Sequence, residues 1–169
     1  LLEPYADNGE RECFDIRSIA IMGKAGILAG NKGDIMLASA HVIEGTSDNY
    51  LVYNDLCVED FEGQIDTYSG PMLTVVGTSL QNKAILRRLQ RGWKAIGLEM
   101  EGGHYQRAIN AALIKGHIDS TTKTRYAYYA SDNPLQSGQT LASGPMGQEG
   151  IAPTYLITKV LLEKILNPA

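Results

Sequence analysis

The sequence lacks a cysteine framework and any long apolar run. Its 169 residues include only two cysteines, Cys13 and Cys57, which have no metal-ligand spacing and are expected to be free, packed thiols. The apolar stretches are short and interrupted, so neither a transmembrane helix nor a signal peptide is expected. A cytoplasmic location follows by default.

An excess of basic residues is also missing. Lysine and arginine number 15 against 19 aspartates and glutamates, for a formal net charge of −4. Nucleic acid and anionic membranes require basic faces, so neither is expected as a partner. His41, His104 and His117 are scattered without metal-ligand spacing, and we expect no metal and no other cofactor.

What is present is the composition of one domain with one core. A hydrophobic content of 44% in 169 residues is sufficient for this. Residues 1–15 are polar and turn-rich, which predicts a loop or arm without chemistry, and residues 16–169 predict a single α/β domain. Because the chain begins at Leu1 and not at methionine, one expectation is a fragment or a processed product.

Apolar runs alternate with amphipathic stretches along this domain, which is typical of α/β proteins. Strands are expected over residues 17–22, 35–40, 71–77, 95–98 and 126–130. The first leads into a glycine turn, Gly23-Lys24-Ala25-Gly26, of the kind that cradles oxyanions and ribose oxygens. Lys24 is either a solvated charge or an anion ligand. A tight turn at 31–34 suggests that the first two strands form a hairpin.

Helices are expected to follow three of these strands. One starts after a cap at Thr78 or Ser79, another begins at Met100 and stops at Gly116, and the last covers 153–166. The first has an apolar side of Ala84, Ile85, Leu89 and Trp93, and a solvent side of Arg87, Arg88 and Arg91. The second turns Ala108, Ala111, Ala112 and Leu113 inward. Small residues allow this second helix to lie close to the sheet.

Acidic residues stand at the ends of two predicted strands. Glu99, Met100 and Glu101 follow one strand, and Asp132 ends another. If these strands are parallel neighbours, Glu101 and Asp132 lie at the edge where open α/β sheets bind ligands. Local roles stay open: Asp132 as an Asx-turn residue, Glu101 as a favourable helix N-terminal charge, Met100 as core filling. Glu99 is interpreted as structural.

Four motifs occur in a specific order: Gly23-Lys24-Ala25-Gly26 before Gly33-Asp34-Ile35, Glu44-Gly45-Thr46-Ser47, Glu99-Met100-Glu101 and Ser131-Asp132. This order resembles that of the nucleoside phosphorylase and nucleosidase superfamily, and residues 23–26, 44–51 and 131–135 look most like AMP nucleosidases. The resemblance covers about residues 16–140. It implies a three-layer α/β fold, with a central mixed sheet that partly closes into a barrel and is flanked by helices.

The resemblance also implies cleavage of the N-glycosidic bond of a purine nucleoside or nucleotide. Asp132 would be the general acid at purine N7, and Glu101 would accept hydrogen bonds from the ribose hydroxyls. Such groups suit the reaction, because bond cleavage develops negative charge on the base and positive charge on the sugar. An aspartate of ordinary pKa is ionised at neutral pH, so this role requires burial or a neighbouring acid.

Further contacts are implied around the same substrate. Met100 would pack beneath the sugar, and Leu98 and Leu80 would lie against the base. Gly23 and Lys24 would face phosphate or the nucleophile.

Two departures from the superfamily pattern limit these expectations. Ile21 stands where phosphorylases carry an arginine, and no arginine follows Arg125, which favours water over phosphate as the nucleophile. Family members also begin with a further strand–loop unit that supplies the water-activating carboxylate, and this chain starts after it. Either that segment is missing or separate, or this polypeptide does not turn over substrate alone. Exposed sheet edges would need a cover, and the resemblance implies a homo-oligomer.

Three functions therefore remain as hypotheses. The first is hydrolysis by an AMP nucleosidase-like enzyme of purine metabolism. The second is a phosphate-dependent nucleoside phosphorylase that uses Lys24. The third is a non-catalytic nucleoside- or nucleotide-binding module or an inactive fragment. Phosphate dependence separates the first two, and binding without turnover marks the third.

Overall fold

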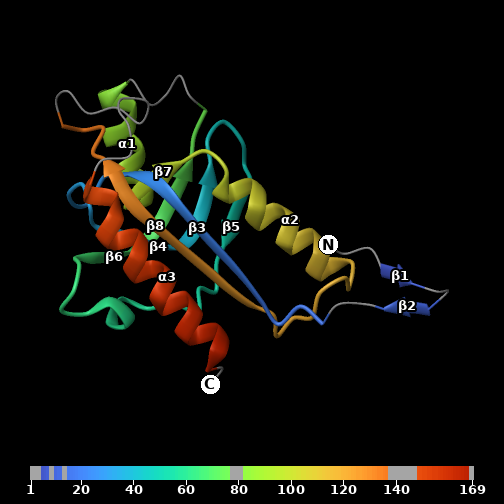
Figure 1. Ribbon diagram of the computed structural model, residues 1–169. Coiled ribbons are helices and arrows are strands. Elements are labelled where there is room, and N and C mark those ends of the chain that lie inside the picture. The colour runs from blue at the N-terminus through green and yellow to red at the C-terminus, as the bar shows by residue number, and fades with distance from the viewer. Residues whose placement is uncertain (1–4, 8–9, 13–14, 77–81, 137–147, 168–169) are drawn as a thin grey trace.

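The computed structural model describes residues 5–7, 10–12, 15–76, 82–136 and 148–167 (Figure 1). The strands are β1 (Tyr5–Asp7), β2 (Glu10–Glu12), β3 (Ser18–Ile27), β4 (Ile35–Ile43), β5 (Asn49–Leu51), β6 (Thr67–Thr74), β7 (Gly97–Glu99) and β8 (Lys123–Asp132). The helices are α1 (Lys83–Trp93), α2 (Gly102–Ile114) and α3 (Ile151–Leu166), with short 3-10 segments η1 (Val58–Phe61) and η3 (Gln148–Gly150). No helix of the described ranges is long and apolar enough to cross a membrane.

The main sheet is mixed and closes on itself. Its six strands have the order β5-β4-β6-β7-β3-β8, and β4 also pairs with β8, so all strands except β5 form a ring. Three pairs of the ring are parallel (β4–β6, β6–β7, β3–β8) and two are antiparallel (β3–β7, β4–β8). The predicted α/β class with a partly barrel-like mixed sheet is therefore confirmed.

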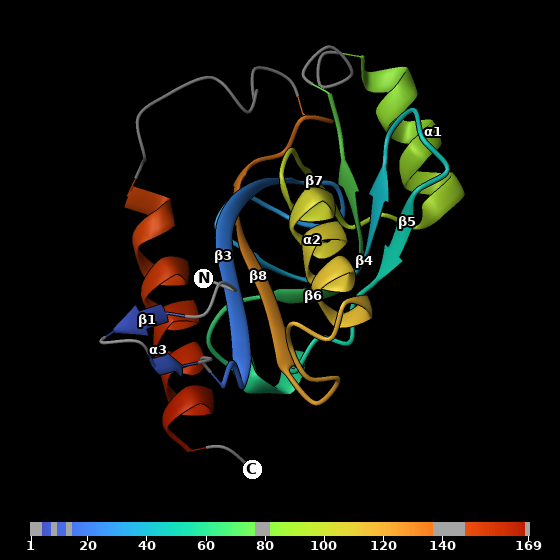
Figure 2. The same ribbon diagram turned by 90° about the vertical axis from the view of Figure 1, so that its right-hand side faces the viewer.

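Helices α2 and α3 lie on opposite sides of β3 and β8 (Figure 2). Alternation along β8 explains how one strand serves both, since successive side chains point to opposite faces. Tyr126 and Tyr128 pack in the cluster that includes Ile109 of α2, whereas Ala127 and Tyr129 pack with residues of α3 such as Ile157. The two helices thus complete the layers that the sequence predicted.

The predicted hairpin of the first two long strands is wrong. The turn itself is present, with Gly33 at a φ of 94° and the N–H of Asn31 donating to the Asp34 carboxylate at 2.7 Å. However, β3 and β4 do not pair; β8 lies between them, parallel to β3 and antiparallel to β4. The partner of β3 comes from a distant part of the chain, which a local turn pattern cannot reveal.

The predicted glycine turn after the first strand is also wrong. Residues 23–26 continue β3 in extended form to Ile27. The smallness of Gly23 serves packing instead, because a Cβ there would lie 3.2 Å from the Tyr128 ring. Ala25 and Ile27 are fully buried, which explains why the strand does not turn away from the sheet.

Helix α1 turns a different side to the core than the sequence pattern indicates. Ile85 and Trp93 are 40% and 44% exposed, whereas Leu86 is fully buried, with Leu89 partly buried beside its cluster. The three arginines of this helix, Arg87, Arg88 and Arg91, are exposed as predicted. A short helix that rests on one narrow contact leaves some apolar side chains in water, and periodicity alone does not show which.

The cap of α1 is Asn82, whose side-chain oxygen accepts hydrogen bonds from the N–H groups of Ala84 and Ile85. The predicted caps, Thr78 and Ser79, lie outside the described residues. Residues 1–15, predicted as a loop or arm, contain the antiparallel pair β1–β2.

Helix α2 approaches the sheet closely, as its small residues predict. Gly102 and Gly103 are buried, and the chain leaves the helix at Gly116 with a φ of 66°. Ala112 faces inward as expected, but Ala108 is exposed. Cys57 is exposed as well, so its predicted packing role is wrong, and Cys13 lies outside the described residues.

Candidate functional site

The strands that carry the two acidic motifs are neither neighbours nor parallel, contrary to the sequence-based expectation. Strand β3 lies between β7 and β8, antiparallel to the first and parallel to the second. The motifs still meet, because Gly26 of β3 is the register partner of Leu98 on one side and of Asp132 on the other. The candidate site is therefore built around β3.

Asp132, the last residue of β8, is a buried acid with one free oxygen. It is 4% exposed. Ser131 Oγ donates to Oδ1 at 2.7 Å, while buried Oδ2 has no hydrogen-bond partner among the described residues. Burial raises the pKa of this carboxyl more than the Ser131 hydrogen bond and the charges of Lys24 and Lys32 lower it. The direction of this pKa shift is the one that a general acid requires.

The turn that follows β8 is formed by the next residue. Asn133 Oδ1 accepts from the N–H of Leu135 at 3.0 Å, and its Nδ2 donates to the carbonyl of Gly30 at 2.9 Å. Asn133 therefore makes the Asx-type turn. The local alternative for Asp132, a turn-forming role, is not what the structure shows.

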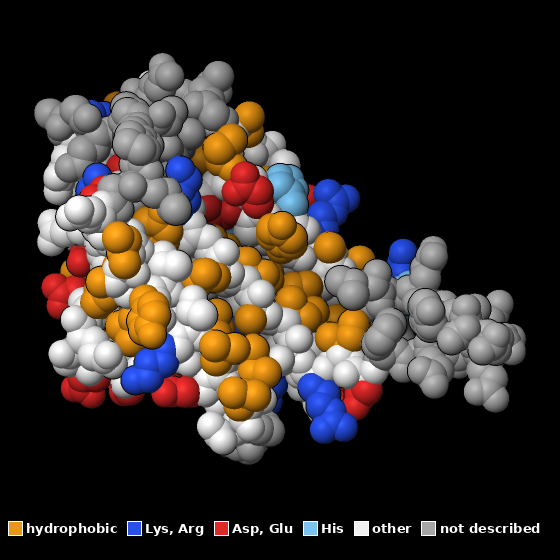
Figure 3. Space-filling model, in the orientation of Figure 1, with side chains coloured by type: hydrophobic (Ala, Val, Ile, Leu, Met, Phe, Trp, Pro, Cys, Tyr) orange, Lys and Arg blue, Asp and Glu red, His pale blue; other side chains and the backbone are white. Residues whose placement is uncertain are grey.

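Glu101 and Met100 are accessible at the beginning of α2. Glu101 is exposed and stands at the N-cap, yet its side chain makes no capping hydrogen bond. Met100 is 44% exposed, so it does not fill the core. Acidic side chains lie in the upper part of the face shown in Figure 3, close to the start of α2 in the same orientation. Both residues are free to contact a ligand.

The side chain of Glu99, just before them, is buried. It is 3% exposed, and its carboxylate accepts from Thr74 Oγ1 at 2.5 Å and from the N–H groups of Glu101 and Gly102. His41 Nδ1 lies 3.4 Å from Oε1. Burial raises the pKa of Glu99, but its interactions with His41, Thr74 and the Gly102 N–H outweigh burial and hold the pKa below its usual range.

A polar layer surrounds this carboxylate beneath α2. The rings of His41 and Tyr126 meet edge to face, with centroids 4.9 Å apart, and those of His41 and Tyr128 lie 6.4 Å apart. His41 Nε2 and the hydroxyls of both tyrosines are buried without a hydrogen-bond partner in the described part of the chain. Burial, followed by the charge of Glu99, raises the pKa of Tyr128. This layer was missed at the sequence level because its members come from three strands.

Gly23 and Lys24 lie on β3, at a cavity of about 700 Å³ that β3 shares with α3. Tyr129 and Thr154 also line it. Lys24 is exposed, and its charge reaches the candidate acid, since it lowers the pKa of Asp132. The lysine therefore lies near enough to act on the acid electrostatically, although in a strand and not in a turn.

Of the two leucines expected at the base, Leu98 is not open to a ligand. Leu98 has no exposed surface and packs with Leu73, Val75 and Leu86. Leu80 lies outside the described residues.

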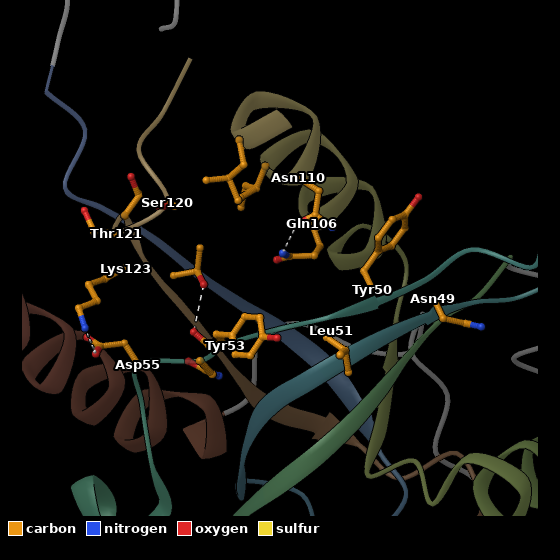
Figure 4. A pocket seen from close by; sticks show the side chains of 15 residues that line it. Asn49, Tyr50, Leu51, Tyr53, Asp55, Gln106, Asn110, Ser120, Thr121 and Lys123 are labelled. Atoms are coloured by element: carbon orange, nitrogen blue, oxygen red, sulfur yellow. Dashed lines mark hydrogen bonds and ion pairs between the residues drawn. The ribbon is translucent and has the colours of Figure 1, made fainter. Parts of the chain in front are cut away.

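A cavity of about 880 Å³ contains none of these acids (Figure 4). Gln106 and Asn110 of α2 face it, joined by a hydrogen bond of 2.9 Å. Its carboxylate, Asp55, is paired with Arg125 at 2.7 Å and lies 3.7 Å from Lys123. With its acid neutralised, this cavity lacks the groups needed for glycosidic cleavage. The described residues also contain no cluster of metal-ligand type.

The closed mixed sheet, with its helices, has the fold of several solved nucleosidase structures. A 5′-methylthioadenosine nucleosidase of Arabidopsis thaliana is similar with a TM-score of 0.58 and 18% identity, over 90% of this chain and 63% of its own. The 5′-methylthioadenosine/S-adenosylhomocysteine nucleosidase of Campylobacter jejuni is similar with a TM-score of 0.62 and 16% identity. The match covers 88% of this chain and 69% of that one. The corresponding enzyme of Helicobacter pylori is similar with a TM-score of 0.65 and 14% identity. The match covers 87% of this chain and 68% of that one. At such identities the similarity shows the fold alone.

Within this fold, the chain belongs to the family described as "Family of unknown function (DUF6909)", whose model matches residues 9–167. It spans 63–69% of the length of the three nucleosidase structures. Comparison with curated proteins gives no match.

Proposed function

We propose that this chain forms the catalytic part of a nucleosidase that hydrolyses the N-glycosidic bond of a purine nucleoside or nucleotide. The observation that carries the proposal is Asp132: a buried carboxyl with a raised pKa and one oxygen without a partner among the described residues. It lies across Gly26 from the strand that leads to Glu101. A carboxyl kept neutral by burial can give its proton to a departing base.

In the proposed reaction, the bond between C1′ of the ribose and N9 of the purine breaks, and its electron pair goes to the base. Asp132 gives its proton to purine N7 as negative charge develops there. A water oxygen bonds to C1′, and the water loses a proton, which restores the acid through solvent. Glu101 accepts hydrogen bonds from the ribose hydroxyls, and its charge stabilises the cationic sugar.

The proposal also assigns roles to the other residues around the substrate. Met100, half exposed beside Glu101, packs beneath the sugar. Gly23 and Lys24 face the phosphate of a nucleotide substrate or the nucleophile. Full burial of Leu98 argues against direct contact with the base, so Leu98 supports the site from within the core. Adenine is the base of choice for a test, because the similar structures are named for adenosine derivatives.

Assembly is part of the proposal. Strand β3 pairs with β7 only at Gly26 and Ile27, so residues 18–25 present one edge without a strand partner among the described residues. Apolar side chains gather over this region, between α2 and α3 (Figure 3). Unpaired edges are normally covered, and a second copy of this chain is the proposed cover.

The test is incubation of the purified protein with AMP, adenosine and 5′-methylthioadenosine, with and without phosphate, followed by chromatography of the products. Release of adenine without phosphate supports the nucleosidase. Release that requires phosphate supports the phosphorylase instead. Binding of adenosine without release of adenine under either condition contradicts both enzymes and leaves a binding module.

A further inference from the structure

The first turn of α2 is held by side chains of two strands and not by its own residues. The N–H groups of Glu101 and Gly102 both donate to Glu99 Oε2, the first at 2.6 Å. The N–H of Gly103 donates to Thr74 Oγ1 at 2.9 Å. These are among the donors that a helix start leaves without intrahelical partners. Strands β7 and β6 therefore cap this helix.

The capping carboxylate is itself fixed. Thr74 Oγ1 donates to Glu99 Oε1 at 2.5 Å, and His41 Nδ1 lies 3.4 Å from the same oxygen. Thr74 is 2% exposed and His41 is fully buried. Oε2 of Glu99 thus accepts two hydrogen bonds and Oε1 accepts one, with His41 Nδ1 nearby. A buried carboxylate with three hydrogen bonds is held in one geometry.

Because Glu99 and Thr74 cap the helix, the side chain of Glu101 is not needed as a cap. An N-cap residue ordinarily satisfies the first N–H groups of its helix with its own oxygen. Glu101 occupies the N-cap without doing so, and it is exposed. Its backbone is held by Glu99, while its carboxylate is left for another partner.

We propose that Glu99 is a positioning residue, which together with Thr74 holds the first turn of α2 so that Glu101 can bind the ribose hydroxyls of a nucleoside. This inference rests on the proposed function. Glu99 is buried beneath the turn and does not itself reach the substrate. Its contribution is to keep the Glu101 backbone in place as ligand binds.

The charge of Glu99 is the property to remove. In Glu99→Gln one acceptor oxygen becomes an NH₂ donor of the same size. That donor faces either the backbone N–H groups of Glu101 and Gly102 or the Thr74 hydroxyl and His41. In the first orientation donors meet donors. In the second the remaining oxygen still accepts from the two N–H groups, but it has lost its charge, so the hold on the turn is weaker in both. Glu62→Gln is the matched control, because Glu62 is exposed and lies outside this network.

The experiment compares wild type, Glu99→Gln and Glu62→Gln in two measurements. Amide hydrogen exchange at residues 101–103 reports the hold on the turn, and calorimetric titration with adenosine and with adenine reports the ribose contribution. We expect faster exchange in Glu99→Gln alone. We expect its affinity for adenosine to fall by about 10–100-fold, the range for hydrogen bonds to a charged group, with adenine binding within about twofold of wild type.

Unchanged exchange in Glu99→Gln overturns the inference, since Glu99 would then not hold the turn. An equal loss of affinity for adenosine and adenine also overturns it, because the effect would be general and not directed at the ribose. Wild-type protein that binds neither ligand overturns the proposed function and the ribose role with it. Faster exchange in the variant would still support the hold on the turn in that case.

Thr74 supplies a second route if Glu99→Gln does not fold. Thr74→Val keeps the shape of the side chain but loses the hydroxyl that joins Glu99 to the Gly103 N–H. We expect it to reproduce the selective loss of adenosine affinity, and Thr74→Ser to restore most of it. Failure of Thr74→Ser to restore binding contradicts the role of this hydroxyl.

Discussion

Asp132 and Asn133 are adjacent at the end of β8 but differ in their partners. Asn133 uses its amide for the turn, through Leu135 N–H and the Gly30 carbonyl. Asp132 keeps one oxygen unpartnered among the described residues, in surroundings that favour the neutral carboxyl. Because Asn133 forms the turn, Asp132 is not needed for it and can serve as the candidate acid.

Substitution Asp132→Asn tests this at the level of one atom. The amide keeps the shape of the side chain but has no acidic proton for the base, so the rate of adenine release should fall by about 10²–10⁴-fold. Affinity for adenosine should change little. Asp15→Asn serves as control, because Asp15 is exposed in a surface pair with Arg17. A variant that retains the wild-type rate would exclude Asp132 as the acid.

The raised pKa of Asp132 also predicts a pH dependence of stability. Its folded pKa lies above the unfolded one, so the folded state binds more protons in the window between the two values. The contribution of this residue to stability is present below the unfolded pKa and is lost as the pH rises through the folded pKa. Glu99, with its lowered pKa, has the opposite sign and loses its contribution on acidification.

Urea unfolding of wild type and Asp132→Asn across this pH range measures the effect. Because the variant cannot ionise at this position, its free energy of unfolding should increase relative to that of wild type as the pH rises. Above the folded pKa of Asp132 this difference should become constant. The rate of adenine release by wild type should decline over the upper part of the same window. A difference between the two proteins that does not vary with pH would contradict the raised pKa.

At the scale of elements, helix α2 is placed by its glycines. A Cβ on Gly102 would clash with the His41 ring and lie 2.5 Å from Tyr128 Oη, and one on Gly103 would lie 2.6 Å from Thr74 Oγ1. Only residues without a side chain allow the helix start to come this close to β4, β6 and β8. The close approach in turn brings the N–H groups within reach of Glu99 and Thr74.

Gly102→Ala should therefore destabilise the protein by about 1–3 kcal/mol, since the added methyl group overfills a buried contact. Gly92→Ala in α1 is the matched control. Outside its own helix, no atom of the described residues lies within 4 Å of its Cβ position, and a helical alanine should stabilise by about 0.5–1 kcal/mol. Denaturant unfolding of both variants gives the comparison. Equal effects at the two positions would show that α2 has room to move away from the sheet.

The whole molecule has a closed ring of strands, yet it leaves part of β3 open. Cavities of about 700 and 720 Å³ flank this strand, one lined by residues of α3 and the other by residues of α2. Met22 of this strand is 43% exposed, and Tyr155 of α3 is 77% exposed. A strand edge that has no partner among the described residues, with apolar side chains on both flanks, favours association.

Light scattering coupled to size-exclusion chromatography should accordingly show association that increases with protein concentration. Met22→Lys places a charge on the open strand and should shift the protein toward the monomer, as edge lysines do in natural sheets. Lys159→Met, on an exposed position of α3, controls for the change of charge. Monomeric wild-type protein at all concentrations would rule out the proposed homo-oligomer and favour another polypeptide segment as the cover.

Much of the fold was accessible from the sequence because it depends on local patterns. Most predicted strands and all three helices are present, and α2 ends at Ile114, two residues before the predicted stop at Gly116. Errors arose where distant residues compete. The predicted hairpin of β3 and β4 does not form, because β8 pairs with both strands and lies between them. The apolar side of α1 was predicted wrongly, because it depends on the surface against which the helix packs.

The candidate site divides in the same way. The acids at 101 and 132 were recognisable because each follows an apolar run and stands in a motif. Glu99, interpreted only as structural, acquires its capping role from Thr74 and His41, which lie far from it in the chain. No local signal distinguishes the buried glutamate of Glu99-Met100-Glu101 from the exposed one.

The sequence by itself determined the α/β class, the order of the motifs and the residue types available for acid chemistry, because these follow from short-range periodicity and from the identity of neighbouring residues. Tertiary structure decided that β3 separates the two acidic strands, that Asp132 is buried with a free oxygen, and that Glu99 faces inward while Glu101 faces solvent. The physical reason is that strand pairing, burial and the pKa shifts they cause depend on residues brought together from distant parts of the chain.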